Sequence, residues 1–311
     1  MRLVMMQVGV APAEPGVLIE DGSVARIGAL VPGAALGSIA DVLAAWPEIR
    51  DRIADGIEAL RSGDARQADD GIVEASSVRL RAPLGDRALV VCAGGNYRSH
   101  NAEMGGGPPR VQSFVKSSSS VIGSNEPIRL PEPFPDMVDY EGEICVVFDR
   151  ECHGVKAEDA LKYVGGYTIL NDVSDRSGVA AIRNAKTHEE DRWAFQEVVM
   201  GKQFPTFAPI GPTVVTAEDV PDPTTLRLIT TLNGAVMQDA VTSDLETPIP
   251  ELIERMSQYY KFRPGDVLST GTPAGTGAGQ SPPRYLRDGD NVSIEVQPIG
   301  VLSNDVRAAT T

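Results

Sequence analysis

Two stretches decide the fold: Asp139-Tyr-Glu-Gly-Glu-Ile-Cys-Val-Val-Phe148 and Gly166-Tyr-Thr-Ile-Leu-Asn-Asp-Val173. Both have the apolar, β-branched composition of buried strands. Side chains alternate between the two faces of a strand, so Glu141 and Glu143 point the same way, about 6–7 Å apart. Asp172 adds a third acid at the end of the second strand. Three carboxylates without nitrogen or thiolate ligands favour Mg²⁺, Mn²⁺ or Ca²⁺ over zinc or copper.

A pair of glutamates at alternate positions is also typical of the solvated face of an edge strand. The residues after Glu143 argue against that alternative, because the strand is wholly apolar from Ile144 to Phe148. Such a run indicates burial on both faces. Unpaired carboxylates are costly to bury, and a bound cation removes that cost.

Charge and composition exclude several kinds of partner. The 311 residues include 28 Lys plus Arg and 43 Asp plus Glu, which gives a formal net charge of −15. This charge repels nucleic acids and anionic membranes, so we expect neither as a partner. A small anionic substrate then needs local cations or a metal. The N-terminal sequence predicts no signal peptide and no transmembrane span.

Cysteine usage indicates a reducing compartment. The three cysteines, Cys92, Cys145 and Cys152, form no Cys-x-x-Cys pair and have no histidines at zinc spacing. We expect reduced thiols in a cytoplasmic protein.

The hydrophobic pattern divides the chain near residue 80. Residues 1–35 predict short antiparallel strands, and residues 38–64 predict one or two amphipathic helices. The polar stretch from Ser62 to Asp70 is interpreted as a linker. We therefore expect a small N-terminal α/β domain at residues 1–80.

The remaining residues, 81–311, predict a larger domain dominated by β-structure. Short apolar runs separated by Gly and Pro fill this part of the chain, with helices expected around residues 157–163 and 250–260. The fold class predicted for the whole chain is α+β, with β-structure dominant.

A second group of residues indicates acid–base chemistry. His100 and Glu103 lie three residues apart, a spacing that brings their side chains together in a helical turn. A carboxylate beside an imidazole orients the ring and raises its basicity. The alternative is a surface histidine beside an incidental acid. The following residues, Gly105 to Pro109, combine flexible and rigid positions and suit a mobile lid.

Over roughly residues 88–305 the sequence resembles the fumarylacetoacetate hydrolase superfamily, and its acylpyruvate hydrolases in particular. The resemblance consists of several motifs in the same order. They are Gly95-Asn-Tyr-Arg-Ser-His-Asn-Ala-Glu103, Phe114-Val-Lys116, Ile128-Arg-Leu-Pro131, Asp139-Tyr-Glu-Gly-Glu143, Gly166 to Ser174 with Arg176, Gly201-Lys-Gln-Phe204, Pro209-Ile-Gly-Pro212, Leu232-Asn-Gly234 and Gly271-Thr-Pro-Ala-Gly275. The fold that the resemblance implies is a mixed β-sandwich roll, and the implied assembly is a homodimer.

By this resemblance, Glu141, Glu143 and Asp172 are the ligands of one Mg²⁺ or Mn²⁺ per subunit. His100 and Glu103 match the catalytic dyad of the family, carried on a lid segment.

The resemblance also assigns substrate contacts. Lys202 matches a catalytic lysine that reaches the substrate, Thr272 lies in a loop that contacts the substrate carboxylate, and Tyr97 and Arg98 belong to the motif that carries the dyad. For Lys202 the alternative is a solvated loop lysine. For the glycines after Gly271 the alternative is that they simply form turns. Those glycines are not a P-loop, because the Lys-Ser/Thr ending is absent.

The stretch from Ser177 to Gln196 departs from the family pattern, in which many relatives have a shorter segment with an early glutamine in the site. Gln196 is one candidate for that glutamine. His188 is expected at the surface, although the cleft is the alternative, and His153 is expected in a turn.

Together these features predict a metal-dependent hydrolase that cleaves a carbon–carbon bond in a 2,4-dioxo acid of the acylpyruvate or fumarylpyruvate type. The enzymatic alternatives are an oxaloacetate decarboxylase, a 2-oxo-enoate isomerase and a sugar-acid dehydratase, since all of these reactions pass through an enolate. A catalytically silent metal-binding protein is the alternative of a different class. His100 and Glu103 argue against it, because a structural metal does not require them.

Overall fold

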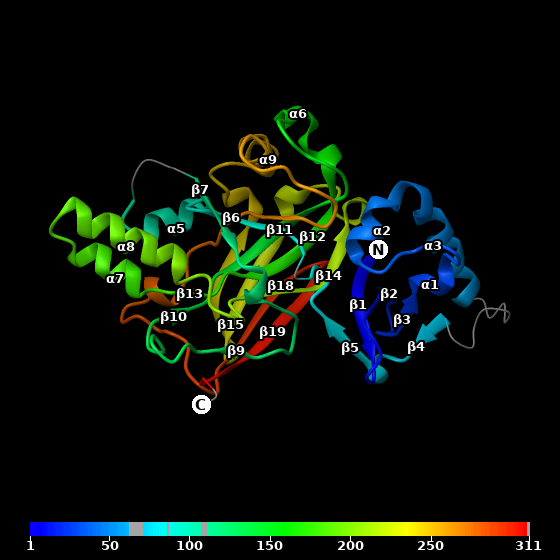
Figure 1. Ribbon diagram of the computed structural model, residues 1–311, viewed down its shortest axis with the longest axis horizontal. Coiled ribbons are helices and arrows are strands. Elements are labelled where there is room, and N and C mark those ends of the chain that lie inside the picture. The colour runs from blue at the N-terminus through cyan, green and yellow to red at the C-terminus, as the bar shows by residue number, and fades with distance from the viewer. Residues whose placement is uncertain (62–70, 86, 107–110, 310–311) are drawn as a thin grey trace.

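The computed structural model describes residues 1–61, 71–85, 87–106 and 111–309, with residues 62–70, 86, 107–110 and 310–311 outside the description (Figure 1). The linker predicted at Ser62 to Asp70 therefore lies outside the described residues, as do most of the residues of the predicted lid.

The described residues form one long sheet and one shorter sheet (Figure 1). The long sheet has the spatial order β4 (Ile72–Val73), β3 (Val24–Arg26), β2 (Glu14–Leu18), β1 (Arg2–Val8), β14 (Ala208–Thr216), β12 (Val164–Asn171), β11 (Gly142–Phe148), β17 (Val267–Ser269), β6 (Val90–Gly94) and β7 (Gln112–Lys116). Two further strands join it, β5 (Val78–Arg81) beside β1 and β8 (Val121–Ile122) beside β14. The shorter sheet has the order β16 (Ala235–Val241), β15 (Arg227–Leu232), β18 (Asn291–Val296), β19 (Gly300–Arg307) and β9 (Ile128–Arg129), and a separate pair joins β10 (Val138–Asp139) to β13 (Ser174–Asp175).

Strand β11 separates two hydrophobic cores, which explains its unbroken apolar sequence. Ile144 and Val146 pack into the core that contains Leu228 of the shorter sheet. Cys145 and Val147 face the opposite way, into a core shared with the N-terminal residues. The alternation confirms that this strand is buried on both faces, as the sequence predicts.

The helices surround these sheets. They are α1 (Ile27–Leu30), α2 (Ile39–Ala44), α3 (Trp46–Arg61), α5 (Arg98–Glu103), α6 (Ala157–Ala160), α7 (Ser177–Asn184), α8 (His188–Met200) and α9 (Ile249–Met256). Helices α2, α3, α6 and α9 confirm the helical stretches that the sequence predicts. Helices α7 and α8 were not predicted, although Thr187 and Glu190 form a capping box that marks the start of α8. Within the described ranges, no helix has the length and hydrophobicity needed to cross a membrane.

The N-terminal strands continue the long sheet across residue 80. Strand β1 pairs with β14 through Arg2 opposite Val215 and Leu3 opposite Val214. The N-terminal helices share their core with residues of β11 and β12, such as Leu170. The division into residues 1–80 and 81–311 stays a prediction, while the overall class, mixed and rich in β-structure, is confirmed.

Candidate active site

One cavity of about 300 Å³ brings together six of the nine residues that the sequence analysis assigned to the site. Its lining includes His100, Glu141, Glu143, Asp172, Lys202 and Thr272. These residues come from α5, the β10–β11 connection, β11, the end of β12, the residues after α8 and the loop after β17. The acids lie close together at one end of the β11–β12 strand pair. There Gly142, between Glu141 and Glu143, is paired with Asn171, which precedes Asp172.

The structure places Tyr97 and Arg98 away from this cavity. The Tyr97 side chain is fully buried in the core below α5. The Arg98 side chain donates to the carbonyl oxygen of Ser243 at 3.2 Å and pairs with Glu246 at 3.3 Å. Neither is among the residues that line the cavity.

Lys202 joins two of the predicted metal ligands. Its Nζ donates to Oε2 of Glu141 at 2.6 Å, to Oδ2 of Asp172 at 2.6 Å and to Oγ of Ser174 at 2.7 Å. The ammonium thus uses all three of its protons on buried acceptors. Lys202 is buried, which is inconsistent with a solvated loop lysine.

Arg176 and Asp139 extend this ion-pair network, and neither is among the site residues predicted from the sequence. Arg176 donates from Nη2 to Oε1 of Glu141 at 2.5 Å and from Nε to Oδ2 of Asp139 at 2.9 Å. Asp139 also accepts the backbone N–H groups of Gly277 at 2.7 Å and Ala278 at 3.0 Å. The network therefore ties the floor of the cavity to the glycine-rich loop.

Lys116 supports Asp172 from the side opposite Lys202. Its Nζ donates to Oδ1 of Asp172 at 2.7 Å and to the carbonyl oxygen of Val173 at 3.1 Å. The Lys116 side chain is fully buried. Asp172 is therefore held in one orientation by two ammonium groups. Lys116 belongs to the motif Phe114-Val-Lys116, and no role is predicted for it from the sequence.

Glu143 is the acid whose environment best fits a metal ion. It is buried and accepts a hydrogen bond from the hydroxyl of Ser269, and among the described residues it has no ion-pair partner. Burial, followed by the charges of Asp172 and Glu141, raises its pKa well above the ordinary value. A cation at this position would keep the carboxylate ionised.

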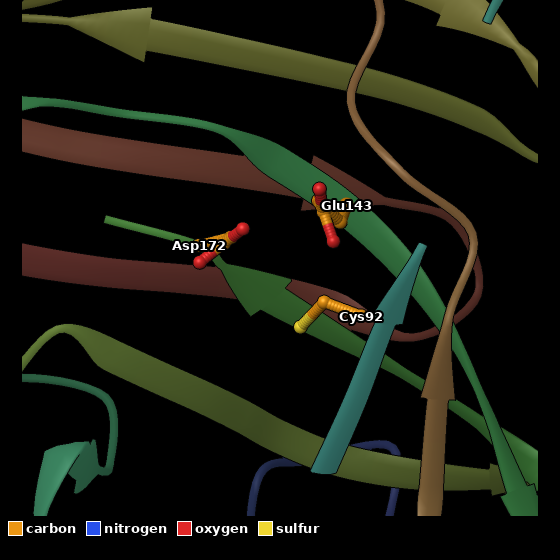
Figure 2. A group of neighbouring side chains, drawn as sticks. All are labelled: Cys92, Glu143 and Asp172. Atoms are coloured by element: carbon orange, nitrogen blue, oxygen red, sulfur yellow. The ribbon is translucent and has the colours of Figure 1, made fainter. Parts of the chain in front are cut away.

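Figure 2 shows Glu143 and Asp172 turned toward one another with the thiol of Cys92 beside them. One possible ligand atom from each lies within 4.8 Å of the other two. Four buried carboxylates, Asp139, Glu141, Glu143 and Asp172, face three buried cations, Lys116, Arg176 and Lys202, which leaves one excess negative charge. Two of the three predicted ligands, Glu143 and Asp172, therefore lie close enough together to share a divalent cation. Glu141 is not in this group, because its two carboxylate oxygens are bound by Arg176 and Lys202. Cys92 is an additional neighbour that the sequence analysis did not predict at this site.

The predicted pairing of His100 with Glu103 is present, with 3.0 Å between Nδ1 and Oε2. Glu103 also accepts the backbone N–H of Gly275 at 2.8 Å and the hydroxyl of Thr276 at 3.3 Å. Burial alone would raise the pKa of Glu103, but the hydrogen bonds from His100 and Gly275 hold it below the ordinary value. The acid thus stays ionised beside the imidazole and can orient the ring.

Thr272 is held at the cavity by its neighbours. Its hydroxyl donates to the carbonyl oxygen of Gly142 at 3.0 Å and accepts from Nε2 of Gln238 at 2.8 Å. The stretch that departs from the family pattern supplies Phe195 of α8 to the cavity instead of a glutamine. Gln196 is exposed and outside the lining, and His188 is exposed at the start of α8.

Three comparisons place the chain among known proteins. The family model described as fumarylacetoacetate hydrolase C-terminal matches residues 89–307. Oxaloacetate tautomerase YisK of Bacillus subtilis is 36% identical over 235 residues, which are 74% of each protein. Among solved structures, maleylpyruvate hydrolase of Sphingobium sp. SYK-6, in complex with manganese(II) and pyruvate, superposes with a TM-score of 0.78 over the whole of both chains at 26% identity.

A probable 2-hydroxyhepta-2,4-diene-1,7-dioate isomerase of Mycobacterium abscessus also superposes over the whole of both chains, with a TM-score of 0.78 and 28% identity. These similar proteins include a hydrolase, a tautomerase and an isomerase by name. The family match covers well over half of the chain and includes every residue of the cavity. The protein therefore belongs to the fumarylacetoacetate hydrolase family.

Proposed function

We propose that this protein is a divalent-metal-dependent hydrolase that cleaves the C3–C4 bond of a 2,4-dioxo acid of the acylpyruvate or fumarylpyruvate type. The observation that carries the proposal is His100, which is paired with Glu103 and lines the same cavity as the buried carboxylates and Lys202. A base oriented by an ionised acid is suited to activating water. The solved relative that holds manganese and pyruvate supports both the metal and the product.

The metal we propose is one Mg²⁺ or Mn²⁺ per subunit, held by Glu141, Glu143 and Asp172. Bound there, it would supply Lewis-acid polarisation of the substrate's 2-oxo group. Arg176 and Lys116 keep two of these acids in place, through Glu141 and Asp172 respectively. Thr272 is the proposed contact for the carboxylate of the substrate.

His100 is the proposed base. Its Nδ1 is engaged with Glu103, so Nε2 is the nitrogen that takes a proton from water. The resulting hydroxide adds to C4, and the C3–C4 bond breaks with its electron pair moving to C3. The positive charge of Lys202 stabilises the enolate that forms. Transfer of the proton to C3 yields pyruvate and a carboxylic acid.

Keto–enol tautomerisation of oxaloacetate is the second candidate, and the 36% identity to YisK favours it. This reaction requires no water as nucleophile. His100 would only carry a proton between C3 and the enol oxygen, with Glu103 again orienting the ring. The same residues therefore serve both reactions, and the products distinguish them.

The deciding experiment uses chelator-treated protein with acylpyruvates, fumarylpyruvate and oxaloacetate, before and after addition of Mg²⁺ or Mn²⁺. We expect metal-dependent loss of the dioxo acid's ultraviolet absorbance together with formation of pyruvate. Loss of oxaloacetate enol absorbance without pyruvate would identify a tautomerase, and pyruvate from oxaloacetate alone would identify a decarboxylase. If no 2-oxo acid is consumed with either metal, then the hydrolase proposal is wrong, and an isomerase, a sugar-acid dehydratase or a silent metal-binding protein takes its place.

The homodimer stays a prediction from the sequence. Size-exclusion chromatography with light scattering of the full chain tests it directly, because a dimer has twice the 33.0 kDa mass of one chain.

A further inference from the structure

We propose that helix α8 is the acyl-binding wall of the cavity, and that the substrate carries an apolar acyl group instead of a second carboxylate. This inference rests on the proposed function, because it places the 2-oxo acid end of the substrate at the carboxylate cluster. The acyl end then extends toward the remaining lining.

The apolar part of that lining lies on one face of α8. Phe195, Val198 and Val199 line the cavity, and Lys202 follows them just beyond the end of the helix. The steps of three, four and seven residues place all four positions on the same side of a helix. This face of α8 is therefore apolar at Phe195, Val198 and Val199 and reaches the ion-pair network at Lys202.

Close backbone contacts hold α8 in this position. An ideal Cβ on Gly178 of α7 would lie 2.5 Å from the backbone nitrogen of Val198, so only glycine allows α7 to approach α8 this closely. An ideal Cβ on Gly201 would lie 2.8 Å from the carbonyl oxygen of Asp175. The first contact fixes α8 against α7, and the second fixes the residues after α8 against β13 (Ser174–Asp175). Figure 1 shows the two helices beside α5.

The opposite side of the cavity is also largely apolar. Met104 follows α5, and Phe114 of β7 places its ring 4.9 Å from Nζ of Lys202. Gln112 contributes one neutral polar group. The acyl group would thus lie between Met104 and Phe114 on one side and α8 on the other.

The cations of the described lining are already committed to protein carboxylates. Lys202 uses its three protons on Glu141, Asp172 and Ser174, and Arg176 binds Asp139 and Glu141. His100 must be neutral to act as the base. Within the described part of the cavity, a second substrate carboxylate would find no free positive charge. Burying it against the valines of α8 is unfavourable, whereas an alkyl group gains from the same contact.

A matched pair of substrates tests the inference. Butanoylpyruvate ends in a methyl group where succinylpyruvate ends in a carboxylate, and the two are otherwise identical. With manganese-loaded full-length protein, we expect kcat/KM for butanoylpyruvate to be about 100-fold higher. A ratio below about tenfold would overturn the inference and leave the proposed hydrolysis intact, because both substrates would still yield pyruvate.

Substitutions on α8 test which wall sets the preference. Val199→Arg adds a cation to the cavity and should reduce the ratio by at least about tenfold. Trp193→Arg adds the same charge on an exposed side chain of the same helix, outside the lining, and should leave the ratio unchanged. An unchanged ratio in Val199→Arg would overturn the role of α8.

A milder variant covers the case in which Val199→Arg does not fold. Phe195 is 43% exposed at the rim, so Phe195→Ala should fold and should reduce the preference for hexanoylpyruvate over acetylpyruvate by about threefold or more. An unchanged preference in a folded Phe195→Ala protein would also argue against the wall.

Binding separates failure of the inference from failure of the proposed function. If neither dioxo acid is cleaved, then calorimetric titration of the manganese-loaded protein with 2-oxopentanoate and 2-oxoglutarate makes the same comparison without turnover. Tighter binding of 2-oxopentanoate, by about tenfold or more, supports the apolar wall. Equal or tighter binding of 2-oxoglutarate overturns it.

Discussion

Gly279 lies directly against the carboxyl group of Glu103: an ideal Cβ on Gly279 would lie 2.1 Å from both Cδ and Oε1 of that side chain. The same loop holds the carboxylate through the N–H of Gly275 and the hydroxyl of Thr276. The glycine-rich loop thus holds the acid that orients His100. A glycine is needed at position 279 because the side chain of Glu103 approaches its backbone closely.

Gly279→Ala should displace Glu103 and reduce kcat by about 10- to 100-fold, because the base loses its orienting partner. The loss should fall on kcat while KM changes little, which a general loss of structure would not cause. Gly28→Ala is the matched control, since a Cβ there meets nothing within 4 Å. A kcat like that of the unmodified protein in Gly279→Ala would contradict this role.

His100→Ala should reduce turnover by about 10²- to 10⁴-fold while manganese still binds, because the imidazole lies outside the carboxylate cluster. Steady-state kinetics and manganese electron paramagnetic resonance measure the two effects separately. The exposed histidine in His188→Ala provides the control and should keep full activity. Undiminished turnover in His100→Ala would exclude this residue as the base.

The metal-free protein should lose stability as pH rises, and Glu143 is the cause. Burial and the charges of Asp172 and Glu141 raise its pKa well above the ordinary value of about 4.3. The folded state then binds a proton that the unfolded chain releases. Its stabilising effect is complete below the unfolded pKa and disappears as pH rises through the raised folded pKa.

Thermal unfolding against pH, with and without Mn²⁺, tests this expectation. Without metal, Tm should fall above the ordinary pKa of a glutamate, and Mn²⁺ should restore it most strongly at the higher pH values. Glu143→Gln should flatten the metal-free curve and weaken the response to Mn²⁺. A metal-free Tm that rises across this range would show that another group dominates.

Arg176→Met should destabilise the protein by about 3–5 kcal/mol, because it leaves the buried carboxylate of Asp139 without its ion-pair partner and leaves Glu141 paired with Lys202 alone. Chemical denaturation measures the loss. Arg227→Met removes an exposed pair with Asp239 and should cause no measurable change. Equal effects of the two substitutions would show that the buried network contributes little to stability.

Local sequence patterns predicted the parts of the site whose geometry depends on near neighbours. Alternation along the extended segment that enters β11 placed Glu141 and Glu143 on one cavity, and the three-residue spacing placed Glu103 beside His100. The apolar positions at residues 195, 198 and 199 and the capping box before α8 were equally local signals, and they would have predicted a helix at these residues.

The sequence by itself determined the two strands that lead to the acids, half of the helices and the chemical types of the site residues, because side-chain periodicity and hydrophobic burial act over a few neighbouring positions. The tertiary structure alone decided which distant groups meet. Lys202 reaches Glu141 across 61 positions of the chain, and the N–H of Gly277 reaches Asp139 across 138. Such contacts depend on how the sheets pack and where the loops close, and no local preference of the backbone encodes them.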